Sequence, residues 1–233
     1  MDQVGAIVAA AGSGLRLRAG SADETPKALR ILGDRTLVAH VVAQLQAAAV
    51  TSIVVVGPAE RLDEMRKVLP GDVTVVAGGD TRQASVFAGI EALPPEVDIV
   101  LVHDAARALA PPELITRVID AVIAGADAVV PGLPIPDTVK VVDALQSVVE
   151  TPDRSSLRAI QTPQGFRRAL LEQAHVMART DPDFGTLATD DAGLVEALGK
   201  AVTVVEGDPL AMKVTTAEDL SLASTLLARR GAE

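Results

Sequence analysis

The sequence of 233 residues contains no cysteine, no tryptophan and no tyrosine. The lack of cysteine excludes disulfides, thiolate catalysis and cysteine-based zinc sites. The only side chains of the Phe, Trp and Tyr type are Phe87, Phe166 and Phe184, which are too few for a platform on which bases stack. A nucleobase bound by this protein would therefore be held mainly by backbone groups and small side chains.

A surplus of positive charge and a long apolar run are also lacking. The formal net charge of -10 and the pI of about 4.8 argue against a general nucleic-acid-binding protein. No apolar run reaches the roughly 18 residues of a membrane-spanning helix, and residues 1–3 lead into the patterned chain without a signal peptide. His40, His103 and His175 show no metal-ligand spacing. We expect a cytoplasmic protein without nucleic-acid or membrane partners.

What the sequence does contain is an alternation of short apolar runs and longer amphipathic segments. Strands rich in β-branched residues are expected at 4–10, 52–57, 72–77, 98–104, 127–132 and 201–207. Helices are expected at 35–49, 59–69, 81–93, 111–125, 167–179, 189–198 and from about 216. Strands that are almost wholly apolar are covered on both faces. The pattern predicts one α/β domain over 1–233, with a Rossmann-like, mostly parallel sheet flanked by helices on both faces.

The stretch from 131 to 166 interrupts this alternation. Proline residues are followed by the alternating segments "TVKVV" and "SVVET", which favour a hairpin or protruding β-arm over another crossover unit. Because projecting arms often pair subunits, we expect residues 137–160 to form a dimerisation arm and the protein to be a homodimer.

A glycine-rich turn follows the first strand. Gly12 and Gly14 would let backbone N–H groups approach a phosphate. Leu17 stands where the dinucleotide fingerprint has its third glycine, and the Walker pattern is absent, so a nicotinamide-dependent dehydrogenase and a P-loop are disfavoured. Arg16 and Lys27 are suitable partners for a triphosphate. A turn with solvated cations is the alternative.

Eight motifs occur in order along nearly the whole chain: "AAAGSGLRL" with "PK", "VAGGDTRQASV" (76–86), "VHDAAR" (102–107), "DTVK" (137–140), "TPDR" (151–154), "TPQGF" (162–166), "TDDA" (189–192) and "GDPLAMKVTTAEDL" (207–220). Each motif is weak alone, but the ordered set closely resembles the 2-C-methyl-D-erythritol 4-phosphate cytidylyltransferases of the non-mevalonate isoprenoid pathway. The segment between Arg16 and Lys27 is several residues longer than is usual in that family.

The resemblance implies a nucleotidyltransferase that uses Mg²⁺. The phosphate of methylerythritol phosphate attacks the α-phosphorus of CTP, which releases pyrophosphate and forms 4-diphosphocytidyl-2-C-methyl-D-erythritol. An alkyl phosphate has a second pKa of about 6, so the nucleophile is already ionised near neutral pH and needs no Ser-His or Cys-His activation. Catalysis is then an electrostatic problem of bringing two anions together.

The resemblance also implies roles for individual residues. Arg16 and Lys27 hold the CTP phosphates and stabilise the transition state, while Arg154 and Lys213 position the acceptor phosphate, Arg154 from the other subunit. Asp104 could also orient Mg²⁺. The positions that match CTP-binding residues are Ala10, Ala11, Gly12, Ser13, Gly14, Gly79, Asp80 and Ser85. The positions that match the acceptor site are Asp104, Arg107, Thr138 and Thr162.

Structural interpretations of these residues stay open beside the functional ones. Asp104 and Arg107 could form an internal ion pair, Asp80 or Thr81 could cap a helix, and His103 is more readily explained as structural. Arg154 could form a salt bridge on the surface of the arm, and Lys213 could be a solvated surface lysine. Asp190 and Asp191 could both cap the helix that follows them.

Three other functions also remain open. A cytidylyltransferase for another polyol phosphate, such as ribitol 5-phosphate, would share the CTP motifs. A regulatory nucleotide-binding module would lack turnover, and a dehydrogenase is disfavoured by its missing glycine.

Overall fold

The computed structural model describes residues 2–12, 25–181, 183–186 and 188–230. Its centre is an eight-stranded sheet in the order β10-β7-β11-β6-β1-β4-β5, with β12 also paired to β7. The strands are β1 (Val4–Ala9), β4 (Ser52–Gly57), β5 (Thr74–Ala77), β6 (Ile99–Asp104), β7 (Ala128–Pro134), β10 (Arg158–Ile160), β11 (Gln164–Arg167) and β12 (Val202–Glu206). The β1–β4, β1–β6, β4–β5 and β7–β12 pairs are parallel. The expected mostly parallel α/β sheet is confirmed.

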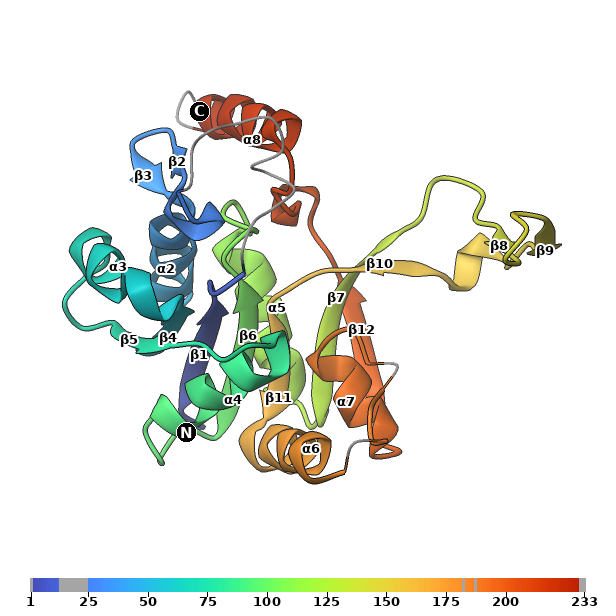
Figure 1. Ribbon diagram of the computed structural model, residues 1–233, viewed down its shortest axis with the longest axis horizontal. Coiled ribbons are helices and arrows are strands. Elements are labelled where there is room, and N and C mark those ends of the chain that lie inside the picture. The colour runs from blue at the N-terminus through green and yellow to red at the C-terminus, as the bar shows by residue number, and fades with distance from the viewer. Residues whose placement is uncertain (1, 13–24, 182, 187, 231–233) are drawn as a thin grey trace.

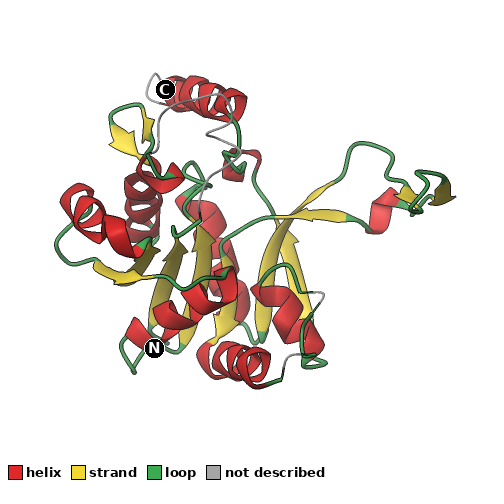
Figure 2. Cartoon of the chain, in the orientation of Figure 1, coloured by secondary structure: helices red, strands yellow, loops and turns green. Residues whose placement is uncertain are grey.

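Helices cover both faces of this sheet (Figures 1 and 2). Along β1, Ala6 and Val8 belong to one hydrophobic cluster and Ile7 to the other, as the two-residue period of a strand requires. The first cluster packs α2 and α5 against the sheet, and the second packs α4, α6 and α7. The helices are α2 (Leu37–Ala47), α3 (Leu62–Val68), α4 (Arg82–Ala92), α5 (Pro112–Ile123), α6 (Arg168–Thr180), α7 (Asp191–Ala197) and α8 (Ala217–Arg230). No helix among the described residues is long and apolar enough to cross a membrane.

Several helices begin where their capping residues require. The hydroxyl of Thr36 accepts a hydrogen bond from Ala39 N at 3.2 Å at the start of α2. At the start of α8, Thr216 Oγ1 accepts from Asp219 N, and an Asp219 carboxylate oxygen accepts from Thr216 N at 2.9 Å. This reciprocal pair is a capping box built within the segment "TTAEDL". It orders the chain directly after Lys213.

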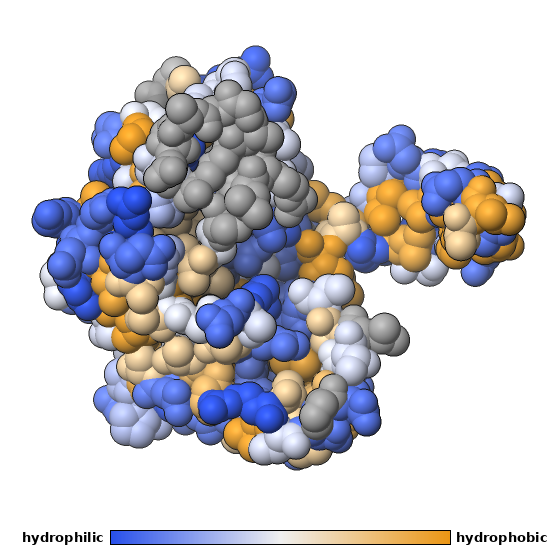
Figure 3. Space-filling view, viewed as in Figure 1, coloured by the Kyte–Doolittle hydropathy of each residue, from blue (hydrophilic) through white to orange (hydrophobic). Residues whose placement is uncertain are grey.

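The arm projects away from the sheet (Figure 1). Its tip is an antiparallel hairpin of β8 (Val141–Val142) and β9 (Val148–Glu150). Leu145, Val148 and Val149 are exposed, by 86%, 58% and 61%, and Figure 3 shows hydrophobic surface along the arm. The expected hairpin is confirmed, although the interruption is shorter than 131–166, because β7 continues to Pro134 and the chain returns to the sheet at β10.

Two antiparallel strands were not expected. β11 lies between β6 and β7, and β10 pairs with the end of β7. Gly165 sits at the crowded centre of β11, where a Cβ atom would lie 2.6 Å from Val118 Cγ1. Smaller departures come from a second hairpin, β2 (Ile31–Leu32) with β3 (Arg35–Thr36), so that the helix expected from residue 35 begins at Leu37.

Candidate active site

A cavity of about 390 Å³ opens at the carboxyl ends of β1 and β6, beside the first turn of α4. The register of the sheet pairs Ala9, the last residue of β1, with Asp104, the last residue of β6. Ala105 N donates to Ala9 O at 3.1 Å, and Ala10 N donates to Val56 O at 2.8 Å. These bonds fix the chain that leaves each strand. The open α/β sheet thus presents its cavity where such folds place their ligands.

The side of the cavity where CTP is expected to bind is built from two glycine-containing turns. Residues 10–12 and residues 79–82 line it, together with Ser85. The turns approach so closely that a Cβ atom on Gly78 would lie 2.7 Å from Ala11 Cβ. Thr81, rather than Asp80, caps α4, because its hydroxyl accepts from Ala84 N at 3.0 Å. Ser85 Oγ donates to Thr81 O at 2.9 Å, so the hydroxyl proton is used and its oxygen remains as an acceptor.

Two lysines bring positive charge to the cavity. Lys27 begins a short 3-10 helix, η1 (Lys27–Leu29), and Lys213 follows the 3-10 helix η4 (Pro209–Ala211); both line the cavity. The expected phosphate ligands Lys27 and Lys213 therefore come together although they are distant in the sequence. Ser13, Gly14 and Arg16, which complete the expected phosphate loop, lie outside the described residues.

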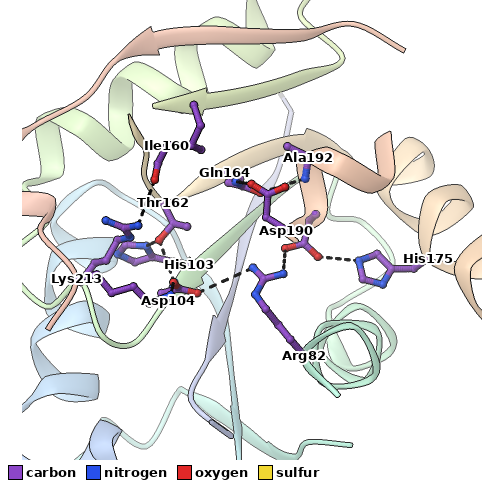
Figure 4. Close-up of polar contacts among 12 residues, drawn as sticks. Arg82, His103, Asp104, Ile160, Thr162, Gln164, His175, Asp190, Ala192 and Lys213 are labelled. Atoms are coloured by element: carbon purple, nitrogen blue, oxygen red, sulfur yellow. Dashed lines mark hydrogen bonds and ion pairs between the residues drawn. The ribbon is translucent and has the colours of Figure 1, made fainter. Parts of the chain in front are cut away.

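Asp104 lies between two cations (Figure 4). Its carboxylate is 2.6 Å from Lys213 Nζ and 4.0 Å from Arg82 Nη2. Burial acts to raise the pKa of Asp104, but Lys213 and Arg82 outweigh burial, so the pKa lies below its ordinary value. The ion pair between Asp104 and Arg107 suggested by the sequence is not formed.

Arg107 instead ties backbone segments together. Its guanidinium donates to Ala211 O at 2.7 Å and to Ile160 O at 3.3 Å. Those carbonyls belong to η4 and to the end of β10, so Arg107 holds both segments beside the loop that follows β6. The side chain does not line the cavity, and its expected contact with the acceptor stays a prediction.

Thr162 contacts both the backbone of Asp104 and the ring of His103. Thr162 Oγ1 accepts from Asp104 N at 3.0 Å and lies 2.7 Å from His103 Nδ1. Burial lowers the pKa of His103 to about 3, so the ring is neutral. Its Nε2 is buried without a hydrogen-bond partner among the described residues. The proton therefore belongs on Nδ1, because a buried N–H without an acceptor is rarer and more costly than an unused lone pair. In this tautomer Thr162 Oγ1 accepts two hydrogen bonds, and its own hydroxyl proton can still be donated to another group. The complete burial of His103 agrees with a structural role.

Arg82, Asp191 and His175 form a cluster that sequence reasoning missed; Figure 4 labels Arg82 and His175 on its two sides. Asp191 is completely buried, 2.6 Å from Arg82 Nη1 and 2.9 Å from His175 Nε2. Its neighbour Asp190 caps α7 by accepting from Gly193 N at 2.9 Å, and it accepts from Gln164 Nε2 at 2.7 Å. Of the two acids expected to cap this helix, only Asp190 does so. The arginine within "GGDTR" and the paired acids of "TDDA" were visible in the sequence, but nothing there linked them.

Thr138 and Arg154 lie on the arm and do not line the cavity of their own chain. Thr138 is exposed. Arg154, in the 3-10 helix η3 (Arg154–Ser156), donates from Nη1 to Pro136 O at 2.6 Å. The surface salt bridge suggested for Arg154 is therefore replaced by a bond to a backbone carbonyl within the arm. The use of these residues by a partner subunit stays a prediction.

The described residues do not fit a metal centre held by protein side chains. No group of three or more His, Cys, Asp or Glu side chains in these parts of the chain could hold an ion. Asp104, the expected ligand, already faces the Lys213 ammonium at 2.6 Å. A cation there would have to bind chiefly through a ligand's own oxygens.

The comparisons with known proteins agree with this geometry. The sequence model of the 2-C-methyl-D-erythritol 4-phosphate cytidylyltransferases matches residues 4–229. Proteins of that name from Rhodococcus jostii and Frankia casuarinae are 49% and 50% identical, covering 95% and 97% of this chain and 94% and 82% of theirs.

Solved structures show the same similarity. A 4-diphosphocytidyl-2C-methyl-D-erythritol synthase from Anaerococcus prevotii has a TM-score of 0.84 at 30% identity, covering 98% of this chain and 99% of that one. The 2-C-methyl-D-erythritol 4-phosphate cytidylyltransferase of Thermus thermophilus has a TM-score of 0.77 at 35% identity, covering 97% and 99%. With its sequence matched over almost its whole length and its fold shared, this chain belongs to the 2-C-methyl-D-erythritol 4-phosphate cytidylyltransferase family.

Proposed function

We propose that this protein transfers CMP from CTP to 2-C-methyl-D-erythritol 4-phosphate in isoprenoid precursor biosynthesis. The products are 4-diphosphocytidyl-2-C-methyl-D-erythritol and pyrophosphate. One observation carries the proposal: Lys27, Lys213 and both glycine-containing turns meet at a single cavity in a chain whose family membership spans its length.

The chemistry follows from the charges in the cavity. The acceptor phosphate is already largely ionised at neutral pH, since its second pKa is about 6, and it attacks the α-phosphorus of CTP without a side chain that removes a proton. Lys27, together with Arg16, would hold the triphosphate and stabilise the negative charge that develops at phosphorus. Lys213 would orient the attacking phosphate. His103 is unsuited to general-base catalysis because it is fully buried.

The turn before α4 would recognise cytidine. Gly79, Asp80 and Ser85 line the cavity, and backbone groups, a carboxylate and a hydroxyl oxygen are what these residues would offer to the base and ribose. Residues 10–14 would approach the triphosphate through backbone N–H groups. Recognition by such groups agrees with the scarcity of aromatic side chains.

Mg²⁺ enters this proposal bound to the nucleotide. The ion would be held chiefly by triphosphate oxygens, and when bound it neutralises phosphate charge. Lys213 lies 2.6 Å from one oxygen of Asp104, so this carboxylate would offer Mg²⁺ at most its other oxygen unless a phosphate draws Lys213 away.

We further propose that the protein is a cytoplasmic homodimer joined through the arm at residues 137–160. Exposed valines and Leu145 on the arm supply apolar surface for a second copy. Thr138 and Arg154, which do not reach their own cavity, would then complete the acceptor site of the partner. Dimerisation would thus be part of catalysis.

The test is pyrophosphate release measured with CTP, Mg²⁺ and a panel of polyol phosphates. We expect release with 2-C-methyl-D-erythritol 4-phosphate and little with ribitol 5-phosphate, with mass spectrometry identifying the cytidine diphosphate product. Faster release with ribitol 5-phosphate would assign the acceptor differently. Binding of CTP without pyrophosphate release, whichever acceptor is added, would indicate a regulatory module instead.

A further inference from the structure

Arg82 occupies an unusual position at the edge of the cavity. It is the first residue of α4 and lines the cavity, with a side chain 33% exposed. A positive charge in the first turn of a helix is unfavourable, because the N-terminal end of the helix is itself positive. An arginine there needs compensating negative groups.

Two carboxylates supply that compensation from different elements. Asp191 of α7 lies 2.6 Å from Arg82 Nη1, and Asp104 of β6 lies 4.0 Å from Arg82 Nη2. Asp191 is completely buried, and His175 Nε2 lies 2.9 Å from its other oxygen. The rigid end of this cluster is therefore Asp191, and the end that faces the cavity is Asp104.

The cluster continues from Asp104 to Lys213, which lies at 2.6 Å. Charges of opposite sign thus alternate from Asp191 through Arg82 and Asp104 to Lys213, and Figure 4 shows the last three of these residues beside one another. Arg82 also directly follows the turn expected to bind cytidine. It is placed to connect the nucleotide side of the cavity with the acceptor side.

We infer that Arg82, anchored by Asp191, is a positioning residue that holds the Asp104 carboxylate and so leaves Lys213 able to take the acceptor phosphate. This inference rests on the proposed function. With Arg82 present, the charge of Asp104 is shared between two cations. Without Arg82, Asp104 would be left with Lys213 as its one cationic partner in the cluster, and its full charge would compete more strongly with the incoming phosphate for that lysine.

A purely structural ion pair is the competing explanation, and single substitutions do not separate the two. In Arg82→Gln, the buried Asp191 charge loses its partner, which destabilises any fold. The double variant Arg82→Gln/Asp191→Asn removes both charges, and the new amide at position 191 still accepts from His175. The double variant leaves no uncompensated charge at position 191, but Asp104 still lacks its arginine partner.

The experiment compares Arg82→Gln, Asp191→Asn, the double variant and Arg82→Lys with the wild type. The matched control is Arg61→Gln, because Arg61 is 35% exposed, pairs with Glu64 at 2.7 Å and does not line the cavity. Melting temperature, kcat and the KM for each substrate are measured by thermal unfolding and pyrophosphate release. The split between the two KM values separates positioning of the acceptor from general damage.

The melting temperature of the double variant should be higher than that of Arg82→Gln and equal to that of Asp191→Asn, because no unpaired carboxylate is left at position 191. Its kcat/KM for the acceptor should nevertheless stay about 10-fold to 100-fold below wild type, with the KM for CTP changed less than about twofold. The kcat/KM of Arg82→Lys for the acceptor should lie between those of the double variant and the wild type, and that of Arg61→Gln should equal the wild-type value. Recovery of wild-type kcat/KM for the acceptor in the double variant would overturn the inference. Absence of turnover by the wild type with every acceptor would overturn the proposed function and this inference together.

Discussion

The ammonium group of Lys213 lies 2.6 Å from the carboxylate of Asp104 at the cavity. The lysine expected to meet the acceptor phosphate therefore already has an anionic partner, and the phosphate must displace or share it. The pair holds Lys213 in place at the edge of the cavity, and the capping box of α8 orders the chain behind it.

Removal of this ammonium group should impair acceptor use selectively. Lys213→Ala should lower kcat/KM for 2-C-methyl-D-erythritol 4-phosphate by roughly 10² to 10³, by analogy with other preorganised charges, while CTP binding measured by calorimetry changes little. Lys200→Ala, which removes an exposed lysine away from the cavity, is the control. Equal loss of CTP affinity would show that Lys213 serves the nucleotide instead.

Mixed dimers test the role of the arm. Arg154→Ala and Lys27→Ala should each be nearly inactive, because each removes a cation from every active site. If Arg154 acts in the cavity of its partner, mixing equal amounts should restore about a quarter of the sites, since half the dimers are mixed and each holds one intact site. Activity is measured after subunit exchange has been verified by native mass spectrometry. No recovery after complete exchange would place Arg154 outside the partner's site.

The turn packing should be sensitive to a single methyl group. A Cβ atom on Gly78 would lie 2.7 Å from Ala11 Cβ and from Ser85 Oγ, so Gly78→Ala must push the two turns apart. We expect a loss of about 1–3 kcal/mol in the free energy of unfolding and a KM for CTP raised about tenfold. Gly71→Ala, where nothing lies within 4 Å of the added atom, should leave both unchanged. A normal KM for CTP in Gly78→Ala would contradict the account of the nucleotide site.

His103 should make the fold sensitive to mild acid. Burial lowers its pKa from 6.5 to about 3, so between these values the unfolded chain binds a proton that the folded protein does not. The contribution of this ring to stability is fully present above about pH 6.5 and decreases as the pH falls toward 3. Between pH 7 and pH 5 the loss should be about 2 kcal/mol.

Urea unfolding of the wild type and of His103→Asn at both pH values measures this difference. The asparagine amide can donate from nearly the position of Nδ1 but does not titrate, so the variant should lose less stability on acidification. His40 and His175 are unchanged in both proteins and cancel in the comparison. Parallel losses in the two proteins would show that His103 is not the group that titrates.

The sequence was sufficient for most of the sheet and its helices, because β-branched runs and helical periodicity are local signals. It was not sufficient for β11. Gln164 and Gly165 carry little strand signal, and they are selected by tertiary contacts instead: Gln164 donates to Asp190, and Gly165 fits against Val118.

The same limit applies to the site. The motifs indicated that Lys27, Lys213, Asp104 and the glycine-containing turns belong to one site, and their described residues line one cavity. They could not show that Asp104 pairs with Lys213 rather than Arg107, since partner choice depends on where the loop after β6 turns. Nor could they show that Asp191 is buried against Arg82 and His175 rather than capping α7.

A crystal structure with CTP and Mg²⁺ bound tests the central claim most directly. The account predicts the triphosphate against Lys27 and residues 10–12, with the cytosine against the turn at Gly79 and Lys213 facing the α-phosphorus. A nucleotide bound outside this cavity, or one whose triphosphate lies away from Lys27 and residues 10–12, would contradict it.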